Sequence, residues 1–255
     1  MYSHVFDTGF SRDISLYETA LEYFDRKIKG DQLPMLTGSC PGWICYAEKK
    51  YGELLPYISK VKSPQQVMGT LINNFITERL GLKNEDVYHV SIMTCYDKKL
   101  EASRSDFRDE NSNVKEVDCV LVPTEIVEIF ERVDFDIKLM PGSPIDPLFT
   151  NIDPNGKLYG MPGVSDGFCE YVFRYSAKHM YDLDPERIEF QIKRNKDFKF
   201  TELKYNDEIV LSFATAYGFR NIQNIVRQIK NGRCNFDFVE IMACPGGCTR
   251  GAGQI

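Results

Sequence analysis

The sequence predicts an α/β fold in which two lobes carry mostly parallel sheets. Short apolar runs typical of buried strands alternate with segments whose apolar residues recur at helical spacing, which favours covered parallel sheets. With 255 residues, 43% of them hydrophobic, the chain can bury a sizeable core as one large domain or two smaller lobes. Residues 140–167, rich in proline, glycine and aspartate, are predicted to form a long irregular loop and the lobe boundary.

The elements of the first half are predicted from apolar spacing and from helix-start chemistry. Val5 and Phe6 favour a short strand. Residues 15–28 repeat apolar side chains at helical spacing, and Ser15 with Glu18 three residues later, beside Asp13, is typical of a capped helix start. The further elements predicted up to residue 132 are strands at 33–36, 87–94 and 117–122 and helices at 41–51, 63–80 and 123–132.

Proline and glycine mark several of these boundaries. Pro41 suits the first turn of a helix, and Pro123 opens another. Ser63 followed by Pro64 is a strong start signal, with the serine as the cap. Gly81 is expected to end that helix.

The second half is predicted to continue the alternation beyond the irregular stretch. The elements expected there are helices at 168–181 and 218–230 and strands at 188–192, 198–203, 209–216 and 236–243, two of which favour a hairpin. No internal repeat and no low-complexity tract interrupts this pattern.

Charge and composition narrow the function classes. A net charge of −6 and a pI near 5.3 argue against a general nucleic-acid binder, and no basic stripe with interleaved aromatics is present. No apolar run approaches membrane-spanning length, and the amino terminus has no apolar signal core. We therefore expect no nucleic-acid or membrane partner, and a cytosolic or nuclear protein. Eight cysteines are too few for a disulfide scaffold and favour metal binding or reduced thiols.

Four cysteines stand in positions that favour a shared metal site. Cys40, Cys95 and Cys244 each follow a predicted strand, and Cys248 shares the last motif with Cys244. Because ligands of open α/β sheets lie beyond the carboxyl ends of the strands, we expect one joint site there. Thiolates are soft ligands that suit the iron of iron–sulfur clusters, which usually take four of them.

The other sequence signals are weaker. The remaining cysteines lack the strand-end position and are predicted to be reduced core or surface thiols: Cys45, Cys119, Cys169 and Cys234. The three histidines form no spaced cluster. The chain has no phosphate-binding loop, no dinucleotide fingerprint after a strand and no nucleophile elbow.

Three motifs together resemble the cluster-binding domain of the iron-only hydrogenase large subunit. The first, TGSCPGW at 37–43, is similar to T-S-C-C-P-x-W and departs at Gly38 and Ser39. The second, MTCYDKKLE at 93–101, is similar to M-P-C-x-x-K-x-x-E and departs at Thr94. The third, EIMACPGGCTRGAGQ at 240–254, is similar to E-x-M-x-C-x-x-G-C-x-x-G-G-G-Q and departs at Ala252. The likeness runs from about residue 5 to residue 254 and implies one such domain over 1–255.

The resemblance implies a cofactor and its ligands. In that family the four matching cysteines hold a [4Fe-4S] cluster, which implies that Cys40, Cys95, Cys244 and Cys248 are the metal ligands here and that the cluster lies between the two lobes. Segments such as CPGWICYAEK and CYDKKLEASR resemble the eukaryotic branch of the family, which holds the nuclear prelamin A recognition factor and the hydrogenase-like cytosolic iron–sulfur assembly factor.

That branch implies a function without hydrogenase catalysis. We expect an iron–sulfur protein of cytosolic cluster assembly that links scaffold proteins to the targeting complex, in the cytoplasm or also in the nucleus. One alternative is a nuclear protein that binds prelamin A, and another is a true hydrogenase. In hydrogenases the cysteine before the first ligand relays protons, and this position is Ser39. A hydroxyl has a far higher pKa than a thiol and cannot readily ionise near neutral pH.

Four further residues are predicted to support the cluster. Lys98 is expected to offset its negative charge and Met242 to shield it, while Gly246 and Gly247 let backbone N–H groups approach sulfur. The alternatives are a solvated lysine and a core methionine. Glu101 is expected to orient Lys98 if that segment is helical, or to be an ordinary surface carboxylate. Trp43, the only tryptophan, is predicted to be a packing anchor.

The resemblance also implies segments that this sequence does not contain. Members of the family carry an amino-terminal ferredoxin-like segment with four more cysteines, whereas the first cysteine here is Cys40. They also continue beyond the third motif. We therefore expect a fragment, a shortened isoform or an incomplete gene model, in which omission of the carboxy-terminal segment leaves the cluster exposed and labile.

Overall fold

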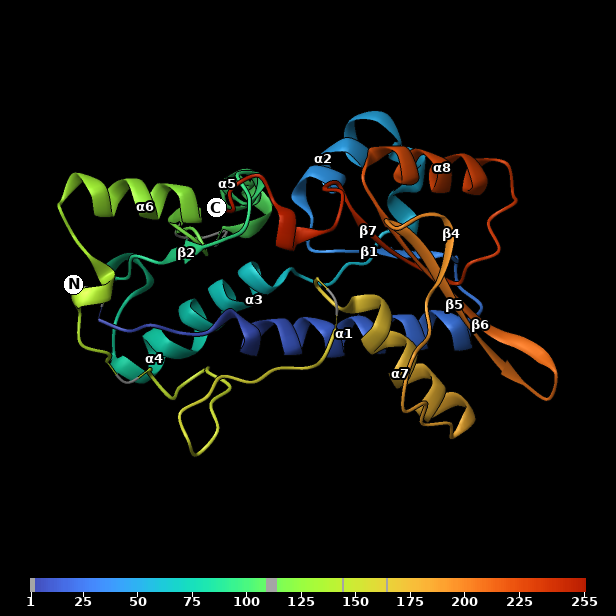
Figure 1. The fold of residues 1–255 in the computed structure, drawn as a ribbon, viewed down its shortest axis with the longest axis horizontal. Helices are drawn as coiled ribbons and strands as arrows, with labels where there is room; N and C mark the ends of the chain where they lie inside the picture. Colours follow the sequence, from blue (N-terminus) through green and yellow to red (C-terminus); the bar gives the residue numbers. More distant parts are fainter. Residues whose placement is uncertain (1–2, 109–113, 144, 164) are drawn as a thin grey trace. The chain divides into compact units, whose positions relative to one another are not determined.

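The computed structural model describes residues 3–108, 114–143, 145–163 and 165–255, and these form two compact units (Figure 1). Unit 1 comprises Met1–Ile14, Lys62–Met161 and Gly251–Ile255, and unit 2 comprises Ser15–Val61 and Pro162–Arg250. One of the crossings between units, at 161–162, falls within the irregular stretch 140–167. The description of 1–255 as one domain with a lobe boundary in that stretch stays a prediction.

The sheet of unit 2 has five strands in the order β1-β7-β6-β5-β4. The β1–β7 and β7–β6 pairs are parallel, whereas β6, β5 and β4 pair antiparallel in succession. The parallel pairs place Thr37, Glu240 and Thr215 in one register across three strands. The strands are β1 (Met35–Thr37), β4 (Gln191–Asn195), β5 (Phe198–Tyr205), β6 (Glu208–Tyr217) and β7 (Phe238–Met242).

Helices cover both faces of this sheet. On one face α1 (Thr8–Lys29), within unit 2 from Ser15 on, and α7 (Phe168–Tyr181) pack on the buried rings of Phe213 and Phe238. On the other face of the sheet lie α2 (Pro41–Lys50) and α8 (Phe219–Lys230), as Figure 1 shows. Both helices contribute to a core that includes Trp43. Trp43 is fully buried, which confirms its predicted packing role.

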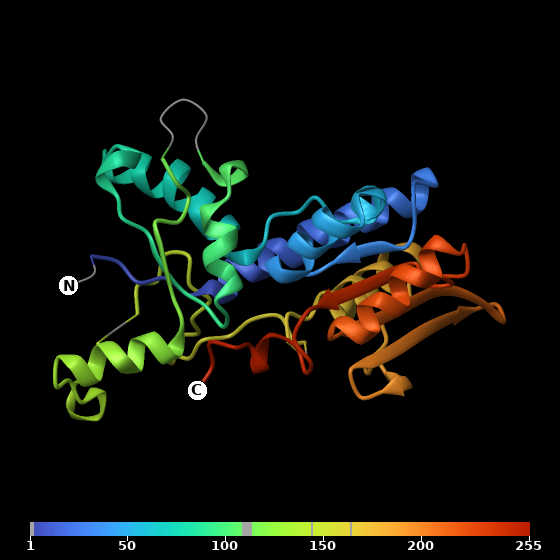
Figure 2. The ribbon, with the colours of Figure 1, turned by 90° about the horizontal axis from the view of Figure 1, so that it is seen from above.

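Unit 1 contains a two-stranded parallel sheet, β2 (Val90–Ile92) beside β3 (Cys119–Leu121). The helical segment over 64–80, teal in Figure 2, is continuous but consists of α3, a π-helical turn at Ile72–Ile76 and α4. Gly81 ends it in the left-handed conformation with φ +64°, as predicted. The helices of unit 1 after α1 are α3 (Pro64–Leu71), α4 (Thr77–Leu80), α5 (Asp97–Ser103) and α6 (Pro123–Arg132).

The α/β class with mostly parallel pairing is confirmed, because three of the five strand pairs among the described residues are parallel. The helices that begin at Pro41, Pro64 and Pro123 are confirmed at their first residues. None of the described helices has both the length and the apolar character needed to cross a membrane.

Three local predictions near helix starts were wrong. The strand at Val5 does not form, because the Val5 N–H donates to the Asp146 carboxylate at 2.6 Å instead of to a strand. The first helix begins at Thr8, so Ser15 is a buried residue inside it and no cap. Ser63 precedes α3 as expected, but its hydroxyl makes no cap bond and donates to the buried Glu101 carboxylate at 2.5 Å.

Candidate metal centre

Cys40 lies just beyond the carboxyl end of β1, at the residue that precedes α2. Its side chain is 6% exposed, and its Sγ accepts a hydrogen bond from the Ala243 N–H at 3.3 Å. Ala243 directly follows β7, and the parallel pairing of β1 with β7 brings both carboxyl ends to the same edge of the sheet. The cysteine of the first motif therefore lies at the start of the third motif's loop.

The loop from Cys244 to Cys248 depends on two left-handed glycines. Gly246 and Gly247 have φ of +79° and +78°, and a Cβ on Gly247 would overlap the Ser165 side chain. The Cys248 N–H donates to Ser165 Oγ at 2.9 Å. This close packing means that only glycine at 247 lets the loop lie against residue 165.

The N–H groups of these glycines have partners other than sulfur. The Gly246 N–H donates to Asp197 Oδ1 at 2.9 Å, and the Gly247 N–H donates to the Cys244 carbonyl oxygen at 3.1 Å. These bonds hold the loop in shape. The role of both glycines toward a cluster stays a prediction.

Met242 ends β7 with a fully buried side chain. Its Sδ lies 3.8 Å from Cys248 Sγ and 3.3 Å from the Ser165 hydroxyl. The methionine is thus both a core residue and a direct neighbour of one of the four cysteines. Its position is compatible with both predictions, a core methionine and a residue that shields the cluster.

Ser39, which precedes Cys40 in the first motif, is 7% exposed and donates its hydroxyl hydrogen to Asp166 Oδ2. The same carboxylate oxygen lies 3.9 Å from Cys248 Sγ. The turn before Cys40 packs tightly as well, since a Cβ on Gly38 would overlap the Ile241 carbonyl oxygen. Asp166 therefore connects the first motif to the third.

Cys95, the second-motif cysteine, belongs to unit 1 and follows the end of β2. Burial raises the pKa of the Cys95 thiol, while the backbone N–H and the charge of Lys98 act in the opposite direction. The Thr94 carbonyl oxygen accepts the Gly253 N–H at 3.2 Å, so the end of the third motif, which is part of unit 1, packs beside the second.

Lys98 and Glu101 form a buried ion pair on α5. Lys98 is 5% exposed and Glu101 is 7% exposed, and the Lys98 Nζ lies 3.0 Å from Glu101 Oε2. The helix forms, and the spacing of three residues places both side chains on one face. The alternatives of a solvated lysine and a surface carboxylate were therefore wrong.

The other cysteines occupy ordinary positions. Cys45 is part of α2 and Cys119 of β3, whereas Cys169 is part of α7 and is fully buried within its core. Burial is the main factor that raises the pKa of the Cys169 thiol well above its ordinary value.

Within the described residues, no three side chains of His, Cys, Asp or Glu are grouped closely enough to hold a metal ion. The four-cysteine ligand set stays a prediction.

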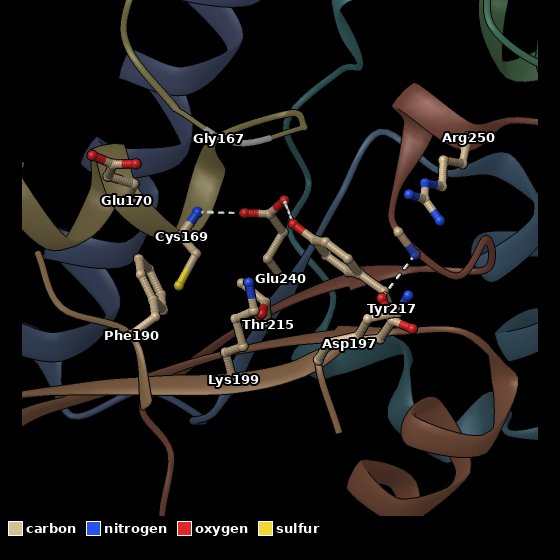
Figure 3. Close-up of a pocket in the computed structure, with 12 residues that line it drawn as sticks. Gly167, Cys169, Glu170, Phe190, Asp197, Lys199, Thr215, Tyr217, Glu240 and Arg250 are labelled. Atoms are coloured by element: carbon tan, nitrogen blue, oxygen red, sulfur yellow. Dashed lines mark hydrogen bonds between the residues drawn. The ribbon is translucent and has the colours of Figure 1, made fainter. Parts of the chain in front are cut away.

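A cavity of about 250 Å³ opens beside the glycine loop in unit 2, lined in part by Tyr217, Glu240 and Gly246 (Figure 3). The Glu240 carboxylate, 1% exposed, accepts the Cys169 N–H at 2.6 Å and the Tyr217 hydroxyl at 2.8 Å. Burial and the neighbouring carboxylate raise the pKa of Tyr217 well above its ordinary value, so the phenol stays protonated as a donor. Glu240 thus ties the start of α7 to β7 and β6.

Tyr217→Phe is expected to lower the free energy of unfolding by about 1.5–3 kcal/mol, because a buried carboxylate loses a donor. Urea denaturation followed by circular dichroism measures this change. Tyr205→Phe, on an exposed β5 tyrosine, is the matched control and is expected to stay within about 0.5 kcal/mol of wild type. Equal effects of the two variants would contradict the assigned role of the Glu240 contact.

Sequence reasoning missed three residues of this centre: Ser165, Asp166 and Tyr217. Ser165 and Asp166 lie at the end of the irregular stretch, where no apolar period points to a role. Their contacts with Cys248 span more than eighty residues of sequence. Glu240 was matched within the third motif, and its placement on a buried strand was the one signal that its carboxylate needs partners.

With this geometry established, comparison with known proteins shows the family. A family model described as iron only hydrogenase large subunit, C-terminal domain, matches residues 2–252. A solved structure of apo FeFe-hydrogenase HydA1 from Chlamydomonas reinhardtii is similar with a TM-score of 0.84 and 27% identity, over 100% of this chain and 70% of that one.

Two curated relatives are similar to almost the whole of this chain. The cytosolic Fe-S cluster assembly factor narfl of Xenopus tropicalis is 46% identical over 257 residues, which is 99% of this chain and 54% of that protein. Protein NAR1 of Arabidopsis thaliana is 45% identical over 269 residues, which is 98% of this chain and 57% of that protein. The chain therefore spans about half the length of the curated relatives it matches.

Proposed function

The chain belongs to the family of the iron-only hydrogenase large subunit, C-terminal domain, and on that premise we propose that it is an iron–sulfur protein of cytosolic cluster assembly. It binds one [4Fe-4S] cluster through Cys40, Cys95, Cys244 and Cys248. It acts by passing a cluster on to other proteins and does not catalyse hydrogen production.

The observation that carries this proposal is the placement of the cysteines at strand ends. Cys40 and Cys244 follow neighbouring parallel strands of unit 2, and Cys95 follows a strand of unit 1. The donor set fits an iron–sulfur cluster, because thiolates are its usual ligands and the Ala243 N–H already donates to Cys40 sulfur. When bound, such a cluster supplies transferable iron and sulfide and one-electron redox chemistry.

The residues around the cysteines suit this role. Met242 contributes a buried apolar wall beside Cys248, and Gly246 and Gly247 allow the tight turn between the two cysteines. The ammonium group of Lys98, held by Glu101, contributes a positive charge near Cys95. A positive charge of this kind offsets the negative charge of a thiolate-bound cluster.

The absence of hydrogenase activity is supported by Ser39. Its hydroxyl is engaged with Asp166 and, unlike a thiol, cannot readily ionise near neutral pH. A proton relay that depends on an ionisable thiol therefore lacks that group at this position. Reduction with a strong reductant should yield no hydrogen, and evolution of hydrogen would refute this part of the proposal.

The assembly role and the cytoplasmic location are supported by the name of the Xenopus tropicalis relative, which is a cytosolic Fe-S cluster assembly factor. The partners are accordingly other proteins of cytosolic iron–sulfur assembly, including the targeting complex. Pull-down of the targeting complex supports this choice, whereas capture of a farnesylated prelamin A tail in its place would favour the nuclear alternative.

Cluster transfer tests the proposal directly. The reconstituted chain is mixed anaerobically with an apo iron–sulfur enzyme and an iron chelator, and recovery of the enzyme's activity is followed. We expect faster recovery than from free iron and sulfide at equal concentration. Recovery no faster than from the free ions, with the cluster retained on the chain, would contradict a role in transfer.

A further inference from the structure

A carboxylate lies beside one of the four cysteines in unit 2. Asp166 Oδ2 accepts hydrogen bonds from the Cys248 thiol at 3.9 Å and from the Ser39 hydroxyl. When Cys248 binds iron as a thiolate it no longer donates this proton, and the carboxylate and the thiolate then bring two negative charges together, which costs electrostatic energy. The contact therefore calls for a functional explanation.

The position of this carboxylate is fixed from two sides. Ser39 is 7% exposed and lies in the tight turn between Gly38 and Cys40. On the other side, Ser165 receives the Cys248 N–H at 2.9 Å, which ties the residue before Asp166 to the cysteine itself.

The backbone at this point is strained as well. Ser165 has φ +57°, in the left-handed region that few residues other than glycine adopt, and it directly precedes Asp166. Such strain persists only where the surrounding structure enforces it, and it is concentrated at functional sites. Serine is kept here in an unfavourable conformation in which its hydroxyl reaches Cys248 and its neighbour's carboxylate reaches Ser39.

We infer that Asp166, positioned by Ser39, lowers the reduction potential of the bound cluster. The inference rests on the proposed function, since it requires Cys248 to be a ligand. Each added electron makes the cluster more negative, and a fixed carboxylate beside a ligand sulfur opposes that addition. Asp166 therefore stabilises the more oxidised state of the cluster.

The test is a redox titration of the whole chain after anaerobic reconstitution. Iron and sulfide are quantified first, and then dithionite supplies electrons while electron paramagnetic resonance follows the reduced cluster. Asp166→Asn removes the charge and keeps the shape of the side chain. We expect its reduction equilibrium constant to rise at least tenfold, a positive shift of about 59 mV for one electron.

Glu170→Gln is the matched control. Glu170 lies four residues further on, in the first turn of α7, and pairs with Arg174 at 3.3 Å. This substitution also removes one negative charge from unit 2, but it leaves the Asp166 contact intact. We expect a clearly smaller shift, and an equal shift in both variants would reduce the effect to net charge and overturn the inference.

Ser39→Ala tests the positioning role. It should change the potential in the wild-type background and leave that of Asp166→Asn unchanged, because the serine acts through the carboxylate.

An unchanged potential in Asp166→Asn with a full cluster would overturn the inference and leave the proposed function standing. Loss of the cluster in Asp166→Asn would also overturn it, since Asp166 would then be needed for binding. A wild-type chain without iron would overturn both.

Discussion

Glu101→Ala is expected to destabilise unit 1 by about 3–5 kcal/mol, because it removes the carboxylate from a buried ion pair and leaves the Lys98 ammonium without it. The side chains of Lys98 and Glu101 are 6% and 9% exposed. The Ser63 hydroxyl and the Gln65 amide also lose their shared acceptor. Since a domain is typically stable by only about 5–15 kcal/mol, this change should leave unit 1 close to unfolding.

Urea denaturation of the full chain, followed by circular dichroism, measures the effect. Glu125→Ala is the control in the same unit, where the Lys99–Glu125 pair is partly exposed, with 38% and 30% of the side chains accessible. That pair and its bond to the Val122 N–H should contribute about 1 kcal/mol. Equal losses in both variants would show that burial of the Lys98–Glu101 pair has no special role.

Gly247→Ala is expected to lose the cluster and to destabilise unit 2. The left-handed backbone alone costs alanine about 1–3 kcal/mol, and the added Cβ would lie only 3.1 Å from Met242 Sδ. It would also overlap the Ser165 hydroxyl that receives the Cys248 N–H. Relief of this overlap requires a shift of Ser165 or of the loop, and either shift disturbs the hydrogen bond that positions Cys248.

Iron content after reconstitution and the urea midpoint together measure this prediction. Gly232→Ala is the control, because Gly232 belongs to the same unit, has φ +62° and has open space where a Cβ would go. It should lose stability through the backbone term and keep its iron. A Gly247→Ala protein with wild-type iron content would contradict the packing described for this loop.

Helices whose starts carry strong local signals were predictable from the sequence. The helices that begin at Pro41 and Pro123 start where proline fixes the backbone, and Gly81 ends α4 by adopting φ +64°. The start of α1 was not predictable, because Ser15 and Glu18 imitate a capping box while the true start at Thr8 lacks an acidic first turn. Local sequence signals therefore identify the end of a helix only when no nearby segment resembles a helix start more closely.

The candidate site was predictable where residues follow strands. Cys40, Cys95 and Cys244 all lie just beyond strand ends, as expected from the apolar runs before them. Asp166 was beyond such reasoning, because its contacts with Ser39 and Cys248 form only when distant segments of the chain fold together. No local sequence pattern in the irregular stretch before α7 predicts these contacts.

The most direct measurement is the iron and sulfide content of eight single Cys→Ser proteins after anaerobic reconstitution. About four irons and four sulfides per chain are expected in the wild type. The substitutions at Cys40, Cys95, Cys244 and Cys248 should each lose the cluster, whereas those at Cys45, Cys119, Cys169 and Cys234 should keep it. A full cluster in any of the first four variants, or no cluster in the wild type, would contradict the four-cysteine site.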